Sequence, residues 1–257
     1  MRWIIQLIRS KVPRKYWGIV WIYYAKLRVL SIFYWGKRVQ CPICEQRFRK
    51  FIPFGNRFKH RANALCPHCL ALERHRLLWL YLQKKTNFFQ APLKVLHVAP
   101  EICFIPRFRK LPNLDYVTAD LESSLAAVKM DLHAIPFSPE SFDVVLCSHV
   151  LEHVKDDQQC MQEIYNVLKP HGWAILQVPI DWSLDKTYED PSITSPIERE
   201  KAFGQKDHLR QYGKDYLDRL AKAGFHVKLD DFLQTLAPTL ISRFALPRDE
   251  KLVVCMK

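Results

Sequence analysis

Residues 141–154 read SFDVVLCSHVLEHV, and residues 161–179 read MQEIYNVLKPHGWAILQVP. Each stretch holds an apolar run of strand length beside a polar turn, and similar alternation continues from residue 92 to residue 257. This pattern predicts six strands, at residues 94–99, 115–120, 142–148, 173–179, 225–231 and 251–256, and two helices, at about 156–168 and 214–223. Strands that alternate with helices indicate an α/β fold, in which a parallel sheet carries helices on both faces.

The last part of this domain departs from simple alternation. Gly224 is suited to end the last helix, because glycine readily adopts the backbone conformation found just after helices. The two strands that follow are joined by no strong helical pattern, so we expect the final strand to be antiparallel. Residues 180–212 are polar with little periodicity, which is typical of a lid or a binding loop.

Charge is distributed unevenly along the chain. Residues 1–90 contain 19 Lys and Arg against two acidic residues, a balance of +17, whereas residues 91–257 contain 20 against 24, a balance of −4. A basic module is therefore joined to a mildly acidic domain. This asymmetry indicates a polyanionic partner, either a nucleic acid or an anionic membrane surface.

We expect three parts: basic aromatic helices over residues 1–40, a cysteine module with a connecting helix over residues 41–90, and the α/β domain over residues 91–257. Within the first part, residues 16–35 are strongly apolar, but Lys26 and Arg28 lie in their middle and argue against a membrane-spanning helix. Two interpretations stay open for this part. It forms helices packed on the domain, or it forms an interfacial helix on an anionic membrane surface.

The cysteines indicate the compartment. Two C-x-x-C pairs account for four of the eight, and the remaining four lie in predicted core segments: Cys103, Cys147, Cys160 and Cys255. A metal site beside free thiols is typical of a reducing compartment. The apolar run at residues 3–8 is too short for a secretory signal. We therefore expect a cytoplasmic protein, with peripheral attachment to the inner membrane face as an alternative.

The two cysteine pairs predict a metal site. Cys41 and Cys44 form the first pair, Cys66 and Cys69 form the second, and 21 residues separate them. Four thiolates presented by two such knuckles close a tetrahedron around zinc. Because the four positions are then filled, we expect a structural zinc ribbon with no catalytic role. His68 is interpreted as a flanking residue.

The segment between the cysteine pairs is basic and aromatic. Its charges and rings are Arg47, Arg49, Lys50, Arg57, Lys59 and Arg61 with Phe48, Phe51, Phe54 and Phe58. Such a mixture suits phosphate binding and base stacking by a nucleic-acid interface. It suits equally a small module whose phenylalanines form its core while the charges are solvated.

The second half of the chain resembles class I S-adenosylmethionine (SAM)-dependent methyltransferases of the type 11 kind, and in particular a bacterial branch with an N-terminal zinc ribbon. The resemblance is carried by LKVLHVAPE (93–101), DYVTADLE (115–122), residues 129–154, residues 161–179 and DHLRQYGKDYLDRLAKAGF (207–225). It implies a Rossmann-like sheet, SAM as the cofactor and methyl transfer as the reaction.

The resemblance also implies a cofactor site. Asp120 ends the predicted strand at residues 115–120, where a carboxylate can bind both ribose hydroxyls, and Leu121 follows it in the expected cofactor site. The resemblance places Asp131, with the Leu132 backbone, against the adenine amino group. Ser148, at the end of the predicted strand at residues 142–148, completes the expected cofactor site. The first loop departs from the family, because His97, Ala99 and Glu101 stand where an acidic residue and two glycines are usual. We expect Glu101 to supply the negative charge for the methionine ammonium group.

Methyl transfer requires positioning of the acceptor and, for a hydroxyl acceptor, a base. Polar residues expected near the strand ends are the candidates: His149, Asp181, His208 and Tyr212. His153 lies in the V-L-E-H-V turn, and the resemblance makes it part of the scaffold.

Three functions follow from these patterns. The leading one is methyl transfer to an unidentified acceptor, such as a small-molecule, lipid-linked or glycan hydroxyl. The second is an RNA methyltransferase that binds RNA through its basic zinc module. The third is a non-catalytic protein that retains the zinc and SAM folds for binding. No motif distinguishes oxygen, nitrogen or carbon as the acceptor atom.

Overall fold

The computed structural model describes residues 31–55 and 60–257. The chain divides into two compact units, which are described separately: Met1–Ala91 with Glu101–Asn113 and Asp231–Lys251, and Pro92–Pro100 with Leu114–Asp230 and Leu252–Lys257. The predicted boundary near residue 90 coincides with the end of the first segment of the first unit. Two later segments of the chain also cluster with that unit. The helices expected within residues 1–30 lie outside the described residues.

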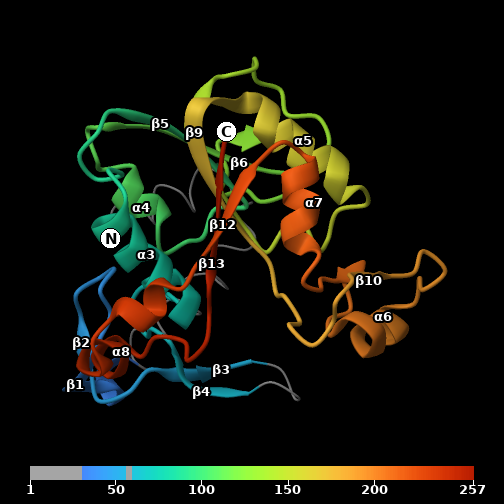
Figure 1. Ribbon diagram of the computed structural model, residues 1–257. Helices are drawn as coiled ribbons and strands as arrows, with labels where there is room; N and C mark the ends of the chain where they lie inside the picture. The colour runs from blue at the N-terminus through green and yellow to red at the C-terminus, as the bar shows by residue number, and fades with distance from the viewer. Residues whose placement is uncertain (1–30, 56–59) are drawn as a thin grey trace, which may run out of the picture. The chain divides into compact units, whose positions relative to one another are not determined.

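The second unit is built on a seven-stranded sheet (Figure 1). Its strands in spatial order are β12 (His226–Asp230), β13 (Leu252–Met256), β9 (Leu168–Gln177), β8 (Phe142–Ser148), β5 (Leu93–Val98), β6 (Leu114–Asp120) and β7 (Val128–Lys129). The strands from β9 to β7 are parallel, and β13 is antiparallel to both of its neighbours. The predicted α/β fold, all six strands and the antiparallel final strand are confirmed.

The order of these strands creates a switch point. From β5 the chain proceeds to β6 on one side and later to β8 on the other side. Connections that leave a strand in opposite directions open a crevice beyond its carboxyl end, where open α/β sheets bind ligands. The residues that follow β5 and β8 are therefore the first place to look for a site.

The sheet packs against two helices of the same unit, α5 (Asp157–Val167) and α7 (Tyr216–Lys222). Asp156 caps α5 by accepting a hydrogen bond from the Gln159 amide at 2.9 Å. Gly224 follows α7 with φ of 104°, as predicted for a helix stop. A side chain at this position would also meet the Tyr165 ring, since a Cβ atom there would lie 2.9 Å from it.

Residues 180–212 contain more structure than their weak periodicity predicts. They form β10 (Tyr188–Glu189), α6 (Pro196–Phe203) and β11 (Arg210–Gln211), and β10 pairs with β11 in an antiparallel ladder. Short elements of this kind are held by contacts distant in sequence, so a periodicity analysis misses them.

In its described part, the first unit contains two small hairpins and several helical segments. The hairpins pair β1 (Trp35–Gln40) with β2 (Arg47–Phe48) and β3 (Ile52–Phe54) with β4 (Arg61–Leu65). The helical segments are α3 (Glu73–Lys85), α4 (Ile105–Phe108), η2 (Phe232–Thr235) and α8 (Pro238–Phe244). No helix among the described residues is long and apolar enough to span a membrane.

A buried arginine organises this unit. Arg76 of α3 is fully buried and lies 4.4 Å from the centre of the Phe51 ring. Its guanidinium group donates hydrogen bonds of 2.6–2.8 Å to four backbone carbonyls: those of Ala64, Ala71, Phe244 and Ala245. One side chain thus joins α3 to the second hairpin and to the end of α8. A buried charge is tolerated here because neighbouring dipoles satisfy its donors.

Candidate active site and cysteine cluster

The two central strands of the sheet both end in a strained residue. Ala99 follows β5 with φ of 48°, and His149 follows β8 with φ of 56°. Non-glycine residues avoid this left-handed region, and such strain concentrates at functional sites. Ala99 occupies the position where the resemblance expects glycine. The loop therefore keeps the backbone conformation that glycine favours, although the residue has changed, and the Ala99 amide donates to the Ala119 carbonyl at 2.9 Å.

Asp120 lies at the carboxyl end of β6, as the sequence predicted. Its Oδ1 accepts hydrogen bonds from the amides of Glu122 and Ser123 at 2.8 and 2.6 Å, which fixes the turn after the strand. Oδ2 makes no hydrogen bond within the described part of the chain. The neighbouring Leu121 side chain is 51% exposed. An acceptor beside an exposed apolar side chain suits a ribose and an adenine ring, and the roles of Asp120 and Leu121 at the cofactor stay predictions.

Asp131 follows β7 and is tied to His133. Its Oδ1 accepts from the His133 amide at 3.0 Å and from His133 Nδ1 at 2.7 Å. These hydrogen bonds lower the pKa of the Asp131 carboxyl below its ordinary value. His133 Nε2 in turn accepts from the Asp156 amide at 3.2 Å. Asp131 is therefore ionised and fixed in place, while the adjacent Leu132 is buried in the core.

The remaining first-loop residues do not line an open strand end. His97 lies within β5, is 1% exposed and contacts the Tyr116 hydroxyl at 2.7 Å through Nδ1. Glu101 belongs to the first unit, where its Oε1 lies 3.8 Å from His75 Nε2. The contact gives His97 a structural role. The role of Glu101 at the methionine ammonium group stays a prediction.

His149 is the best-placed candidate base. It directly follows Ser148, the last residue of β8, and its amide donates to the Gln177 carbonyl at 2.7 Å. Its Nδ1 lies 3.1 Å from Oε1 of Glu152, a carboxylate that is 1% exposed. A carboxylate can only accept, so Nδ1 carries the hydrogen and Nε2 keeps a lone pair. A buried carboxylate that orients a histidine in this way is the usual support of a general base.

His208 lies close to the same carboxylate. It is 4% exposed, its ring centre lies 4.8 Å from that of His153, and burial lowers its pKa below the ordinary value for histidine. Glu152, His153 and His208 each present a ligand atom within 4.8 Å of the others. The structure thus brings together His149 and His208, two predicted site residues that are 59 positions apart.

An arginine clamp holds this arrangement. Arg210 is 3% exposed and donates to the carbonyls of Leu151, Val154 and Lys155 at 2.6–2.8 Å. Nearby, the Leu209 amide donates to the Glu152 carbonyl at 2.9 Å. The turn that contains Glu152 is therefore fastened to the segment that contains His208.

The other two candidate bases, Asp181 and Tyr212, make hydrogen bonds within the protein. Asp181 accepts from the Ser183 amide and hydroxyl through Oδ1 and from Gln211 through Oδ2. Tyr212 is fully buried, and its hydroxyl donates to Asp157 at 2.8 Å. Burial raises the pKa of Tyr212 well above its ordinary value. These contacts favour a structural role for both residues.

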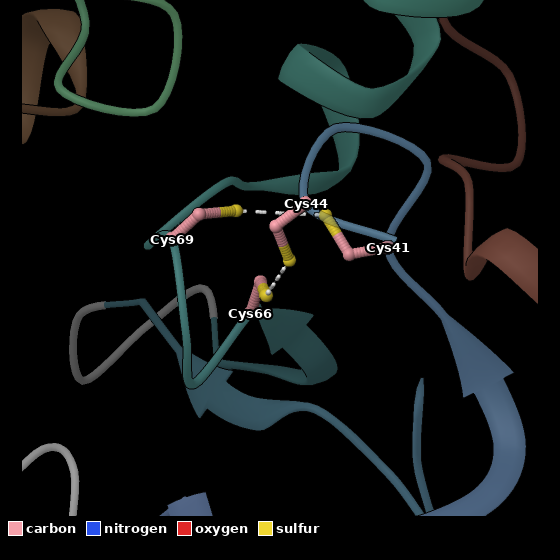
Figure 2. A group of neighbouring side chains, drawn as sticks. All are labelled: Cys41, Cys44, Cys66 and Cys69. Atoms are coloured by element: carbon pink, nitrogen blue, oxygen red, sulfur yellow. Dashed lines mark hydrogen bonds between the residues drawn. The ribbon is translucent and has the colours of Figure 1, made fainter. Parts of the chain in front are cut away.

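The four predicted cysteines meet in the first unit (Figure 2). The Sγ atoms of Cys41 and Cys69 are 3.5 Å apart, and those of Cys44 and Cys66 are 3.7 Å apart. A metal–sulfur distance of about 2.3 Å places tetrahedral sulfurs about 3.8 Å apart, whereas a disulfide requires about 2.05 Å. Four thiolates this close together would repel one another, so a cation would be needed to hold them in this arrangement.

Both knuckles have the same backbone design. The residue after each pair, Glu45 or Leu70, has φ of 61° or 64° and donates its amide to the carbonyl of the first cysteine, at 2.8 or 3.0 Å. The cysteine positions are further held by α4, because Arg107 donates a hydrogen bond to the Ile43 carbonyl. This repeated local geometry fits a four-thiolate metal site.

One protein family matches part of the chain. Residues 102–176 match the family described as a methyltransferase domain. This match identifies residues 102–176 as part of a methyltransferase domain. The family match begins after the first loop, so the altered loop lies outside it. No curated protein matches the chain.

Several solved structures resemble this chain at low sequence identity. A putative methyltransferase from Bacillus halodurans is 18% identical, with 65% of this chain and 92% of that chain covered and a TM-score of 0.40. A SAM-dependent methyltransferase from Archaeoglobus fulgidus is 14% identical, with 70% and 93% covered and a TM-score of 0.45. A putative SAM-dependent methyltransferase from Listeria monocytogenes is 17% identical, with 70% and 96% covered and a TM-score of 0.43.

The surface of the cysteine module fits both interpretations of its sequence. Phe48 and Phe51 are buried and contact each other edge to face, with ring centres 5.9 Å apart. Phe54 is 44% exposed, and Arg47, Arg49 and Lys50 are exposed. Two phenylalanines thus form the core, while Phe54 and the charges face solvent. Phe58, Arg57 and Lys59 lie outside the described residues.

Proposed function

We propose that this methyltransferase acts on a hydroxyl oxygen of a small-molecule, lipid-linked or glycan acceptor, with His149 as the general base. The observation that carries the proposal is the pairing of His149 with the buried Glu152 at the carboxyl end of β8. A hydroxyl group requires a base when it attacks a methyl group, because its proton must leave. Glu152 holds the imidazole in the tautomer that can accept that proton.

The residues of the chain divide the work of the reaction. His149 takes the acceptor proton at Nε2, and the Glu152 carboxylate stabilises the imidazolium that forms. The free oxygen of Asp120 and the exposed Leu121 would hold the ribose and the adenine ring of the cofactor. Asp131 would lie beside the adenine ring. SAM, when bound, supplies a methyl group on a positively charged sulfur. The left-handed backbone at Ala99 allows a close approach to it.

We propose further that the four cysteines hold a structural zinc ion. The observations that support this are the sulfur spacing and the two matching knuckles. Zinc binding by Cys41, Cys44, Cys66 and Cys69 would fill all four positions, so the ion contributes folding energy and no chemistry.

The test is methyl transfer from radiolabelled SAM to lipid, glycan and RNA fractions, with the wild type and the His149→Asn variant. We expect the lipid or glycan fraction to be labelled, and the variant to lose about 10²–10⁴-fold in kcat with unchanged SAM affinity. His226→Asn, which changes an exposed histidine of β12, is the matched control. Wild-type turnover by the His149 variant would remove it from the mechanism.

The second candidate is RNA methylation, which the exposed Phe54 and its basic neighbours favour. It predicts that label appears in RNA and that RNA affinity falls steeply with salt, because phosphate contacts release counterions. Labelling of lipid or glycan alone would decide against it.

We propose a peripheral position at an anionic membrane for this chain. Within the described part of residues 1–40, Ile32, Phe33 and Trp35 are 67%, 66% and 79% exposed, and Lys37 and Arg38 are exposed beside them. Apolar and basic side chains in one segment suit a headgroup region. Flotation with anionic vesicles tests this, and binding that does not change in a Trp35→Ser variant would contradict it.

A further inference from the structure

Three side chains that could bind a metal ion converge inside the second unit. They are Glu152 and His153, from the turn after β8, and His208, from the segment before β11. Their ligand atoms all lie within 4.8 Å of one another. Glu152 and His208 are 1% and 4% exposed. This set is separate from the four-cysteine cluster, and the proposed reaction uses only one of its members, Glu152, through the oxygen that contacts His149.

The tautomers of both histidines follow from their backbone contacts. His208 Nδ1 lies 3.2 Å from the Phe203 carbonyl, and His153 Nδ1 lies 3.1 Å from the Asp207 carbonyl. A carbonyl can only accept, so each Nδ1 carries the hydrogen and each Nε2 keeps its lone pair. A histidine that donates its second ring nitrogen to a backbone carbonyl is the usual arrangement at metal sites.

Two of the converging atoms are buried and lack a partner. His208 Nε2 and Glu152 Oε2 make no hydrogen bond to any described residue. Leaving a buried acceptor unsatisfied costs about 1–3 kcal/mol, and more for a charged group. A cation bound between these acceptors would satisfy both of them and remove that cost.

Hydrogen bonds fix the backbone around these side chains before any ion binds. Arg210 fastens the turn through three carbonyls, and the Leu209 amide fastens Glu152 itself. The second oxygen of Glu152 is occupied by His149 at 3.1 Å. A preformed set of two imidazoles and one carboxylate needs little rearrangement to bind an ion.

We propose that Glu152, His153 and His208 bind a divalent first-row transition-metal ion. Two imidazole nitrogens with one carboxylate oxygen suit zinc, manganese, iron or cobalt, whereas magnesium and calcium prefer oxygen ligands. Three protein ligands leave further positions open, as in catalytic metal sites. Because Glu152 also orients His149, an ion at this site changes the basicity of the candidate base.

The test uses the full chain with its cysteine site loaded with zinc and the weaker site emptied by dialysis against a mild chelator. Cobalt(II) is then titrated and followed by visible absorption and by metal analysis. We expect one cobalt ion per chain, with ligand-field bands and no thiolate charge-transfer band, because the ligands are nitrogen and oxygen. The His208→Asn and His153→Asn variants should bind at least about tenfold more weakly.

His226→Asn is the matched control, since this histidine is exposed on β12. His153 is partly exposed, so its variant tests the site even if the buried His208 variant folds poorly. Wild-type chain that takes up no cobalt beyond the cysteine site would overturn the proposal. Cobalt bound equally tightly by both variants and by the control would also overturn it, because the ion would then lie elsewhere.

Discussion

The cysteine module and the carboxyl edge of the sheet are both organised around converging side chains, but they are built differently. In the module, each half of the cluster comes from a four-residue knuckle, and the two knuckles repeat the same backbone hydrogen bonds. At the sheet edge, Glu152 and His208 are brought together across 56 positions by the clamp of Arg210. Local geometry specifies the first cluster, and tertiary packing specifies the second.

This difference determines what each region tolerates. With the proposed zinc ion bound, the cysteine cluster depends on its four ligands and on that ion, so the loss of one cysteine should abolish the whole site. A cluster specified by packing depends on many small contributions, so single changes should weaken it without unfolding the unit. The following experiments test that contrast.

The largest effect is expected for Cys66→Ser. Loss of one thiolate opens the tetrahedron, and structural zinc sites contribute on the order of 10 kcal/mol to folding. Metal analysis should show loss of the bound ion, and hydrogen exchange should show residues 41–71 unprotected. His68→Ala is the control, because this exposed residue lies inside the same knuckle and should retain the metal. A folded, metal-bound Cys66→Ser chain would show that the cluster is not specified by its ligands.

The next effect is expected for Arg76→Met. The change leaves four buried carbonyls without their donor, and we expect a loss of about 3–5 kcal/mol in the free energy of unfolding. Chemical denaturation measures it, with Lys84→Met on the exposed face of α3 as the control. A loss below about 1 kcal/mol would contradict the role of Arg76 as the centre of the first unit.

Glu250 should make stability depend on pH. Burial raises the pKa of this carboxyl from 4.5 to about 7. The folded state therefore holds the proton more tightly, so stability is full at low pH and is lost as pH rises towards 7. Between pH 4.5 and pH 8 we expect the wild type to lose about 2–3 kcal/mol relative to Glu250→Gln. The Asp249→Asn variant, changed at an exposed neighbour, should show the same pH dependence of stability as the wild type. If the free energy of unfolding of Glu250→Gln changed with pH as that of the wild type does, Glu250 would not be the group responsible.

The smallest effect is expected for Ala99→Gly at the sheet edge. Glycine relieves the left-handed strain of Ala99 but adds chain entropy to the unfolded state, so stability should rise by up to about 1 kcal/mol. Ala119→Gly, in the buried part of β6, should instead be destabilising by about 1 kcal/mol. Thermal unfolding distinguishes the two, and equal losses would show that the backbone at Ala99 is not strained.

Features that depend on nearby residues could be predicted from the sequence. The strands, α5, α7, the helix stop at Gly224 and both knuckles follow from apolar periodicity, glycine placement and cysteine spacing. Asp120 could be placed at a strand end because a run of strand residues precedes it. The role of Glu152 could not, because it depends on burial and on His208.

Long-range contacts explain the rest of what the sequence did not show. In the sequence, Arg76 is one of many basic residues in its region. Its buried position and its hydrogen bonds to the distant Phe244 and Ala245 carbonyls are evident only in the structure. Arg210 and α6 lie in a stretch that reads as a polar loop. His149 was a candidate from its place after a strand, but its orientation by Glu152 needed the structure.

The clamp of Arg210 has a consequence for turnover. Any outward swing of residues 180–212 that displaced this guanidinium would carry His208 away from Glu152 and release the turn that orients His149. Opening of that segment would then disrupt the proposed catalytic centre in the same step. The rate at which residues 180–212 open to admit the substrate would then also limit the rate of each turnover.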